Sequence, residues 1–174
     1  MNPIRVIRNW LQGLISIRRQ MTGLLADDEF GELEGIALRV GDVPCVCWTT
    51  KKKVSYGRYN DVAVRFLSDL TGPQQHQRSA WHHLLQQANR LLDEMEEPLR
   101  QTYEEIRVEW SLLECPAVVQ AQGMRQLVQL DAIEINQSVF PSIVAFVFAV
   151  KWDADHDLTV HVVDGRVESV GVES

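Results

Sequence analysis

The fold is constrained most strongly by an unbroken run of eight apolar residues, Ile143–Val150. The run is rich in Val, Ile and Phe, which favour strands, and it is too short for a typical isolated helix. A strand that is apolar at every position needs cover on both of its faces. The run therefore predicts an interior strand of a sheet.

A hairpin is expected after this run. Alternating apolar residues at 158–163 and 166–170 flank the dipeptide Asp164-Gly165, which is typical of a two-residue type I′ turn. A turn of that length places His161 opposite Glu168 on the neighbouring strand, where the two side chains would form a surface contact.

Further strands are expected on both sides of a long helical region. Pro44 suggests a sheet edge, at least at the start of its strand. Residues 57–61 are expected to form a loop. The expected strands cover residues 30–40, 43–50, 62–66 and 127–135.

The helical region extends from Thr71 to Pro116 and has one continuous apolar face. Pro98 is expected to end or kink it near Glu96 or Glu97. Strands, then helix, then strands predict an α+β fold, a largely antiparallel sheet with a long kinked central helix packed on one face. The apolar face consists of Trp81, Leu84, Leu85, Ala88, Leu91, Leu92 and Met95.

An amphipathic N-terminal helix is expected over residues 3–25. This gives an added helix over residues 1–26 and a single α+β domain over residues 27–174, a length that suits one domain. Its apolar stripe needs burial, so we expect it to pack against protein, either the same domain or a second copy in a homodimer. Neighbouring arginines leave an anionic lipid surface as the alternative. The stripe consists of Ile7, Trp10, Leu14, Ile17 and Met21.

The charge of the chain is uneven. The whole chain carries −7, and residues 1–25 carry +4 through Arg5, Arg8, Arg18 and Arg19. The remaining residues therefore carry −11. Such an acidic body argues against general nucleic-acid binding and suits a basic protein partner, although solubility alone would also explain it.

The cellular compartment is inferred from the cysteines and from missing targeting features. The chain has three cysteines, an odd number, and Cys45 and Cys47 are too close along an extended chain to bridge easily. Neither a secretory signal nor a run of eighteen apolar residues is visible. We therefore expect a protein of the reducing cytoplasm.

The sharpest group of chemically active residues is Asp153, Asp155 and His156. Carboxylates and imidazole could bind a metal or supply acid–base catalysis. The interpretation that we favour is structural: the two aspartates bond turn amides, and His156 caps the entry to the hairpin.

A second group is Cys45 and Cys47, which share one face of a strand because side chains repeat every two residues. Together with Cys115 they could bind a soft metal, but such cysteines are more often small core residues. Phosphate-loop, dinucleotide, nucleophile-elbow and metalloprotease motifs are absent from the sequence. The sequence therefore favours a non-enzyme without a cofactor.

The segment Trp152-Asp153-Ala154-Asp155-His156-Asp157-Leu158, with the later Val163-Asp164-Gly165-Arg166, resembles the last hairpin of a group of uncharacterised bacterial domains. Their pattern is Trp-Asp-x-(Glu or Asp)-His-Gly-Leu, a short strand, an Asp-Gly turn and a strand ending in Val-Gly. The resemblance covers residues 30–171, and Asp157 stands where the group usually has glycine. It implies a fold more than an activity, although some related small domains are suspected immunity proteins that neutralise a partner toxin.

Three functions remain open from the sequence. The first is a protein-binding module, in its narrowest form an immunity-type inhibitor, which the acidic body favours. The second is a small hydrolase or metal-dependent enzyme that uses Asp153, Asp155 and His156. The third is a membrane-surface or assembly role for the N-terminal helix.

Overall fold

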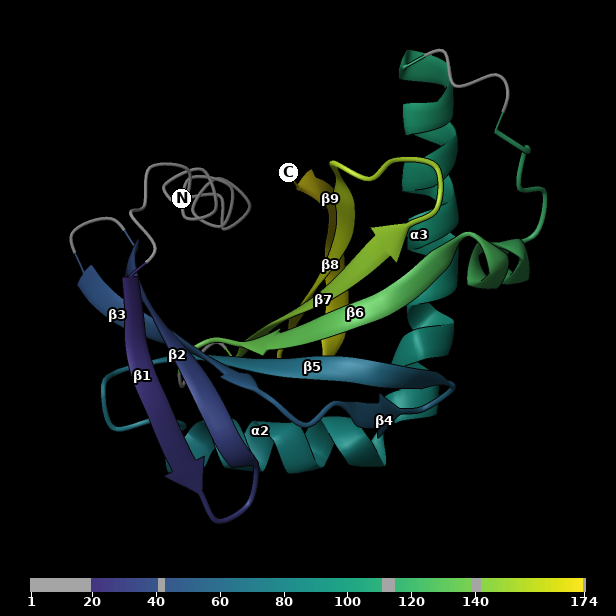
Figure 1. The fold of residues 1–174 in the computed structure, drawn as a ribbon. Coiled ribbons are helices and arrows are strands. Elements are labelled where there is room, and N and C mark those ends of the chain that lie inside the picture. Colours follow the sequence, from purple (N-terminus) through teal and green to yellow (C-terminus); the bar gives the residue numbers. More distant parts are fainter. Residues whose placement is uncertain (1–19, 41–42, 111–114, 139–141, 174) are drawn as a thin grey trace, which may run out of the picture.

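The computed structural model describes residues 20–40, 43–110, 115–138 and 142–173. Within them the chain forms nine strands, two α-helices and one short 3₁₀ helix (Figure 1). The strands are β1 (Gln20–Asp27), β2 (Gly31–Val40), β3 (Val43–Thr50), β4 (Val54–Tyr56), β5 (Tyr59–Ser68), β6 (Val128–Ile135), β7 (Ile143–Val150), β8 (Asp157–Val163) and β9 (Arg166–Glu173). The helices are α2 (Gln75–Gln86), α3 (Ala88–Glu109) and the 3₁₀ helix η2 (Ala121–Gln126).

The strands form one sheet in the order β1-β2-β3-β5-β6-β7-β8-β9, and the short β4 pairs with β5. Every pairing is antiparallel except that of β5 with β6. A parallel pair needs a long crossover, which here contains α2, α3 and η2. The expected α+β fold with a mostly antiparallel sheet and helical cover is confirmed. β7 is interior, between β6 and β8, as its sequence predicts.

The main core lies between one face of the sheet and the two α-helices. Side chains alternate along each strand, so every second residue points into this layer. In β7, Val144, Phe146 and Phe148 are buried there, with Phe146 completely inaccessible to solvent. The helices contribute Trp81, Leu84, Leu91, Leu92, Met95, Leu99, Tyr103 and Ile106 to the same cluster.

Gln77 ties the first helix to the sheet. Its side chain is fully buried, and Nε2 donates to the carbonyl oxygens of Leu67 and Ile135 at 2.9 and 3.0 Å. Its Oε1 accepts a hydrogen bond from the Gln74 N–H at 2.9 Å. These carbonyls belong to β5 and β6, so one side chain satisfies backbone groups at the ends of the parallel pair.

The helical region is interrupted at Gln87, and it does not end at Pro98. The chain breaks between α2 and α3 at Gln87, with φ −110° and ψ 10°, whereas Pro98 lies inside α3. A proline removes one backbone hydrogen bond, but its neighbours Met95, Leu99 and Tyr103 are buried against the core and hold α3 together. The two helices run in different directions along the sheet (Figure 1).

The prediction of a helix over residues 3–25 is wrong for residues 20–25. Residues from Gln20 onward form β1, which pairs antiparallel with β2 as an edge strand. Spacings of three and four also suit a strand when an irregularity interrupts it, and the β1 register shifts between Met21 and Gly23. The sheet thus begins ahead of the expected boundary at residue 27. Residues 3–19 lie outside the described part of the chain.

One local expectation also needs correction. The expected loop at 57–61 is a turn of only Gly57 and Arg58, and Tyr59 already belongs to β5. Gly57 has φ 55°, and an added Cβ would come within 2.6 Å of Leu92, so the tight turn requires glycine.

The sheet edge expected at Pro44 is confirmed for the start of β3. The strand is interior over residues 46–49, where it pairs with β5, but residues 43–45 pair with β2 alone.

The final hairpin has the predicted two-residue turn. Asp164 and Gly165 have φ 49° and 76°, the positive values that a type I′ turn requires. The register then shifts, because Val162 pairs with Val167 but His161 pairs with Ser169. Glu168 is therefore the extra residue of a β-bulge, and the expected pairing of His161 with Glu168 is wrong.

Candidate functional site

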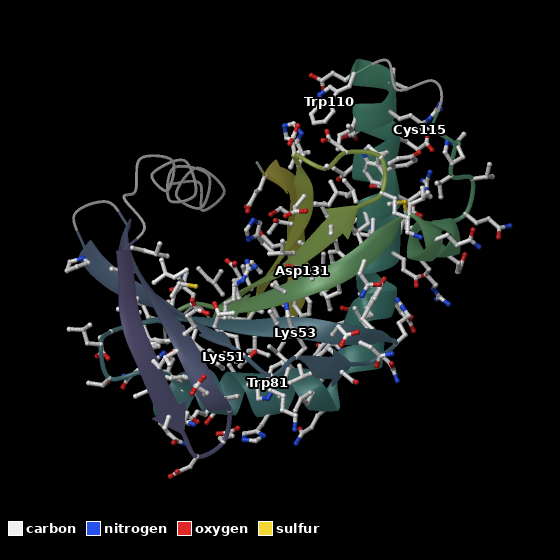
Figure 2. The ribbon with its side chains drawn as sticks, viewed as in Figure 1. Lys51, Lys53, Trp81, Trp110, Cys115 and Asp131 are labelled. Atoms are coloured by element: carbon white, nitrogen blue, oxygen red, sulfur yellow. The ribbon has the colours of Figure 1, made fainter. Side chains whose placement is uncertain are left out.

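The face of the sheet opposite α2 and α3, called the polar face below, gathers ionisable side chains from neighbouring strands. The register places Arg65 of β5 beside Glu134 of β6 and His161 of β8 beside Ala145 of β7. Figure 2 shows Asp131 of β6 on the side of the sheet away from α2. We define the polar cluster as Arg65, Asp131, Glu134, Asp157, Thr159, His161 and Glu173.

A floor of small apolar side chains lies among these polar groups. Ala63, Ala132 and Val147 form a separate buried cluster on three adjacent strands. The register continues from Val147 to Thr159 and then to Gly171. Since none of these floor residues is large, the longer charged side chains around them can reach one another across the strands.

Arg65 pairs with the carboxylates of β6. Its Nη1 lies 2.7 Å from Glu134 Oε1, and its Nη2 lies 3.5 Å from Asp131 Oδ2. Among the described side chains, Arg65 is the only arginine or lysine that forms salt bridges within the polar cluster. Four carboxylates and one arginine leave the cluster with an excess of negative charge.

Asp157 and Glu173 stand directly opposite each other on β8 and β9. Burial, and then the charge of Asp131, raise the pKa of Asp157. Burial, and then the charge of Glu134, raise the pKa of Glu173. Both shifts mean that the surroundings disfavour the ionised form of each of these two carboxyl groups. No described cationic side chain forms a salt bridge with Asp157.

His161 and Thr159 flank this carboxylate pair. His161 is 6 % exposed, and its Nε2 lies 3.8 Å from Glu173 Oε1, which is too far for a hydrogen bond. Burial lowers the pKa of His161, so the imidazole is neutral at neutral pH. Thr159 is 1 % exposed, and its hydroxyl donates to the Glu173 carboxyl, which lowers the pKa of Glu173 but does not outweigh burial and the charge of Glu134.

Two of the cysteines lie on the polar face, as their spacing predicts. Cys45 and Cys47 occupy alternate positions of β3, and Cys47 contacts Thr49 Oγ1 through its sulfur at 4.0 Å. Burial, followed by the charge of Glu134, raises the pKa of Cys47 to about 11. Cys115 packs against the main core on the other side of the sheet. No group of three or more His, Cys, Asp or Glu side chains in the described ranges is placed to hold a metal ion.

Asp153, Asp155 and His156 form a local turn ahead of β8. Asp153 Oδ1 accepts a hydrogen bond from the Asp155 N–H at 2.9 Å, and Asp153 Oδ2 lies 2.8 Å from His156 Nδ1. These two hydrogen bonds, the backbone one first, lower the pKa of Asp153. The Asp155 side chain is exposed. A carboxylate that bonds the amide two residues later forms an Asx turn.

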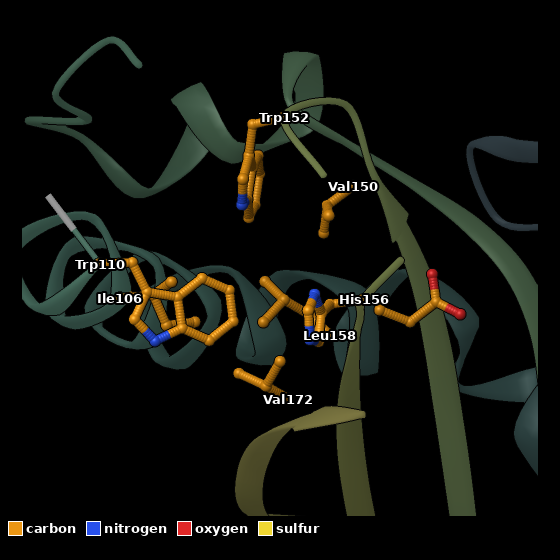
Figure 3. Close-up of a pocket in the computed structure, with 8 residues that line it drawn as sticks. Ile106, Trp110, Val150, Trp152, His156, Leu158 and Val172 are labelled. Atoms are coloured by element: carbon orange, nitrogen blue, oxygen red, sulfur yellow. The ribbon is translucent and has the colours of Figure 1, made fainter. Parts of the chain in front are cut away.

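The His156 ring borders a small apolar recess (Figure 3). Its centroid lies 5.1 Å from that of Trp110, the residue that follows α3. Ile106, Leu158 and Val172 complete this part of the lining, and the Trp152 ring packs against that of Tyr103 at a tilt of 59°, with centroids 4.6 Å apart. The recess therefore joins the C-terminal end of α3 to the last hairpin by apolar and aromatic contacts.

The structure does not place the expected interaction residues of the N-terminal helix at the polar cluster or the recess. Ile7, Trp10, Leu14 and Ile17 lie outside the described residues, and Met21 lies in β1 instead of a helix. Neither of the described α-helices is long and apolar enough to cross a membrane.

The model of one protein family, described as a domain of unknown function (DUF6985), matches residues 31–174. The chain belongs to this family. The whole polar cluster lies within the DUF6985 match, whereas β1 precedes it. Neither the curated proteins nor the solved structures include a match to the chain. Because the DUF6985 family is described as one of unknown function, membership of it does not assign an activity to the chain.

The polar cluster is not visible in the sequence because its members are far apart along the chain. Arg65, Glu134 and Asp157 come from three strands whose adjacency depends on the crossover between β5 and β6. One signal was present: charged residues interrupt otherwise apolar strands at Arg65 and Glu134. Such interruptions indicate a face that is not simply packed.

Proposed function

We propose that this domain is a non-catalytic protein-binding module that holds a basic surface of a partner against its polar face. The observation that carries this proposal is the pair Asp157 and Glu173, two carboxylates directly opposite each other with raised pKa values. Like charges at such positions destabilise a sheet, and a cation supplied by a partner would relieve the repulsion. The charge of −11 outside residues 1–25 would guide a basic partner toward the domain.

Two features favour binding over catalysis at the polar face. The Cys47 thiol, with a pKa raised to about 11, stays protonated at neutral pH and is a poor nucleophile. Thr159 is 1 % exposed, so its hydroxyl is not accessible to a substrate. The contacts between Asp153, Asp155 and His156 are accounted for by a turn.

In its narrowest form, the proposal is an immunity-type inhibitor whose partner is a toxin. The support for this form is the resemblance of the last hairpin to domains suspected of that role, together with the acidic character of the domain. An acidic inhibitor would block a basic active-site surface by occupying it, and it would need no chemistry of its own.

The experiment that tests the proposal is site-specific photo-crosslinking in cells. The crosslinking residue p-benzoylphenylalanine replaces Ser169, which lies beside His161 on the polar face. The matched control carries it at Leu85, an exposed residue of α2 on the opposite side of the molecule. We expect a discrete crosslinked protein from position 169 only, and we expect the double variant Asp157→Asn/Glu173→Gln to abolish it.

The crosslinked protein would then be identified and purified, and its association with the full chain measured at several salt concentrations. Association should slow as salt rises, because screening is effective beyond roughly 8 Å at physiological ionic strength. Equal crosslinking from both positions, or a crosslink to a second copy of the chain or to its own residues 1–19, would contradict a basic partner at the polar face.

A further inference from the structure

A group of apolar side chains, called the apolar patch below, lies on the polar face away from the polar cluster, over β1, β2, β3 and β5. The register joins Ile36, Cys47 and Leu67 in one row across three adjacent strands. Leu24 of β1 lies on the same face and is 55 % exposed. The apolar patch consists of Leu24, Ile36, Leu38, Cys45, Cys47 and Leu67.

Within the described residues, the apolar patch belongs to neither hydrophobic cluster of the fold. Cys45 and Leu67 are only 6 % and 7 % exposed, yet neither is part of the main core or of the cluster around Ala132. The helices α2 and α3 lie on the other side of the sheet (Figure 1). Apolar surface that remains on this side would be stabilised by an amphipathic element packed against it.

Residues 1–19 join the described structure at the border of the apolar patch. Gln20, the first residue of β1, pairs with Ala37, which lies between Ile36 and Leu38 on β2. An element formed by the preceding residues is therefore tethered beside the patch, and the tether gives it a high effective concentration there. A second copy of the chain has no such advantage.

The sequence of this segment has the chemistry that the apolar patch requires. A helix over residues 3–17 would be roughly 22 Å long, whereas three neighbouring strands span about 10 Å, so it could cross β2, β3 and β5. Four large apolar residues recur at spacings of three and four, which places them on one face of such a helix: Ile7, Trp10, Leu14 and Ile17.

The charges of the segment also suit this side of the sheet. Residues 1–19 contain four arginines and no acidic residue. Glu34 of β2 borders the apolar patch, and Glu134 of β6 lies on the same face, beside Arg65. Opposite charges around an apolar contact favour its formation and fix its orientation.

We propose that residues 3–17 form an amphipathic helix whose apolar side packs on the apolar patch of the same chain. Arg18 and Arg19 then connect the helix to β1, a length that is common between a helix and a strand. The helix covers the part of the polar face over β2, β3 and β5 and leaves β8 and β9 open. This inference therefore goes beyond the proposed function and does not rest on it.

The native cysteines of the full chain provide the first test. Iodoacetamide alkylates them, and mass spectrometry follows the rate at each position. Leu14→Glu places a charge on the apolar side of the helix and should speed the reaction of Cys47 by roughly tenfold or more, because the patch loses its cover. Cys115 packs against the main core on the other side of the sheet, and its rate should not change.

The matched control is Gln12→Glu, which adds the same charge on the opposite side of the helix and should leave both rates unchanged. Equal rates at Cys47 in Leu14→Glu and in the unaltered chain would overturn the inference. If Leu14→Glu also speeds the reaction of Cys115, the variant has lost its fold, and crosslinking without that substitution decides.

For this crosslinking, p-benzoylphenylalanine replaces Thr49, which lies on the same face of β3 as Cys47, in an equal mixture of isotopically labelled and unlabelled full chains. We expect crosslinks from position 49 to residues 3–17 in which both peptides carry the same isotope, and none to them from the control position Leu85. Crosslinks between peptides of different isotope would place the segment on a second copy and overturn the inference.

The absence of any crosslink from position 49 to residues 3–17 would also overturn it. Flotation of the full chain with vesicles of phosphatidylcholine and phosphatidylserine would then assign the apolar side of the segment to lipid. Crosslinking at position 169 tests the proposed function separately, because Ser169 lies on β9, at the other end of the strand order from β2. Each of the two proposals can therefore fail while the other stands.

Discussion

The two faces of the sheet treat their carboxylates in opposite ways. On the helix-covered face, Asp27 at the end of β1 accepts hydrogen bonds from Arg78 of α2 and from two backbone N–H groups, and its pKa falls to about 2. On the polar face, Asp157 and Glu173 are half-buried near further carboxylates, and their pKa values rise. The first arrangement satisfies a charge within the fold. The second leaves Asp157 without a salt bridge to any described cationic side chain.

Because side chains alternate along each strand, neighbouring residues of one strand lie on different faces and have different roles. Residues such as Phe146 point toward α2 and α3 and stabilise the fold, whereas their immediate neighbours, such as Ala145, belong to the polar face. Substitutions at adjacent positions should therefore differ sharply in their effect on the free energy of unfolding.

The largest difference is expected in β7. Phe146 is fully buried, and its ring centroid lies 5.6 Å from that of Tyr56. Phe146→Ala should lower the free energy of unfolding by about 3–5 kcal/mol, because it leaves a cavity in the main core. Ala145→Ser, one residue away on the polar face, should change it by no more than about 1 kcal/mol. Urea denaturation of both variants gives the comparison, and equal losses would contradict a division between the faces.

The next largest effect is expected at Gln77. Gln77→Leu removes three hydrogen bonds and leaves the buried carbonyl groups of Leu67 and Ile135 without a partner. The cost should be about 2–4 kcal/mol, measured as a shift of the denaturation midpoint. Gln75→Leu, at an exposed position of the same helix, serves as the control and should stay within about 0.5 kcal/mol of the unaltered chain. A cost at Gln77 no greater than that at Gln75 would show that the helix is held by packing alone.

A smaller, pH-dependent effect is expected at Asp27, whose side chain is 6 % exposed. Its pKa is lowered to about 2, so the stabilisation is complete above the ordinary value of 3.8 and is lost as the pH falls through 2. Asp27→Asn should therefore cost about 2 kcal/mol at neutral pH, and the difference from the unaltered chain should shrink below about pH 4. Asp28→Asn, at the exposed neighbour, should show no such trend in denaturation curves measured between pH 2 and 7.

The smallest effect, of opposite sign, is expected at Glu173. Its pKa is raised, so the protonated form favours folding, and stability falls as the pH rises from the ordinary value of 4.5 through the raised value. At neutral pH, Glu173→Gln should be as stable as the unaltered chain or more stable by up to about 1 kcal/mol, because a like-charge pair is removed. Glu168→Gln is the control. Thermal melts at pH 4 and 7 decide the sign, and a loss of stability at pH 7 would give Glu173 a structural role instead.

The sequence predicted the elements whose signals are local. The apolar run Ile143–Val150, the turn at Asp164-Gly165 and the helical spacing after Thr71 each identify their structure within a few residues. The helix predicted near the N-terminus failed over residues 20–25 because pairing with β2 overrides helical spacing. The break at Gln87 was missed because it depends on how two helices pack on one sheet, and a proline is the more visible signal.

The candidate site could not be predicted in the same way. Cys45 and Cys47 were assigned to one strand face correctly, but their neighbours Arg65 and Glu134 are brought together by strand order alone. The most visible local cluster, around Asp153 and His156, forms a turn. Local spacing reports which residues share a strand face, whereas a site built across strands depends on the register of every pairing between them.

The bulge at Glu168 has a consequence for how this hairpin can evolve. Val167 packs toward the helices, and so do Val170 and Val172, because the extra residue shifts the alternation of β9 by one position. Deleting Glu168 would leave the pairs Val162–Val167 and His161–Ser169 unchanged and would make β9 a regular strand, with Ser169 and Glu173 still on the polar face. Deleting Gly171 instead would turn Val172 outward and Glu173 into the core, because no bulge absorbs the loss there. The bulge is therefore a place where β9 can lose a residue without exchanging its two faces.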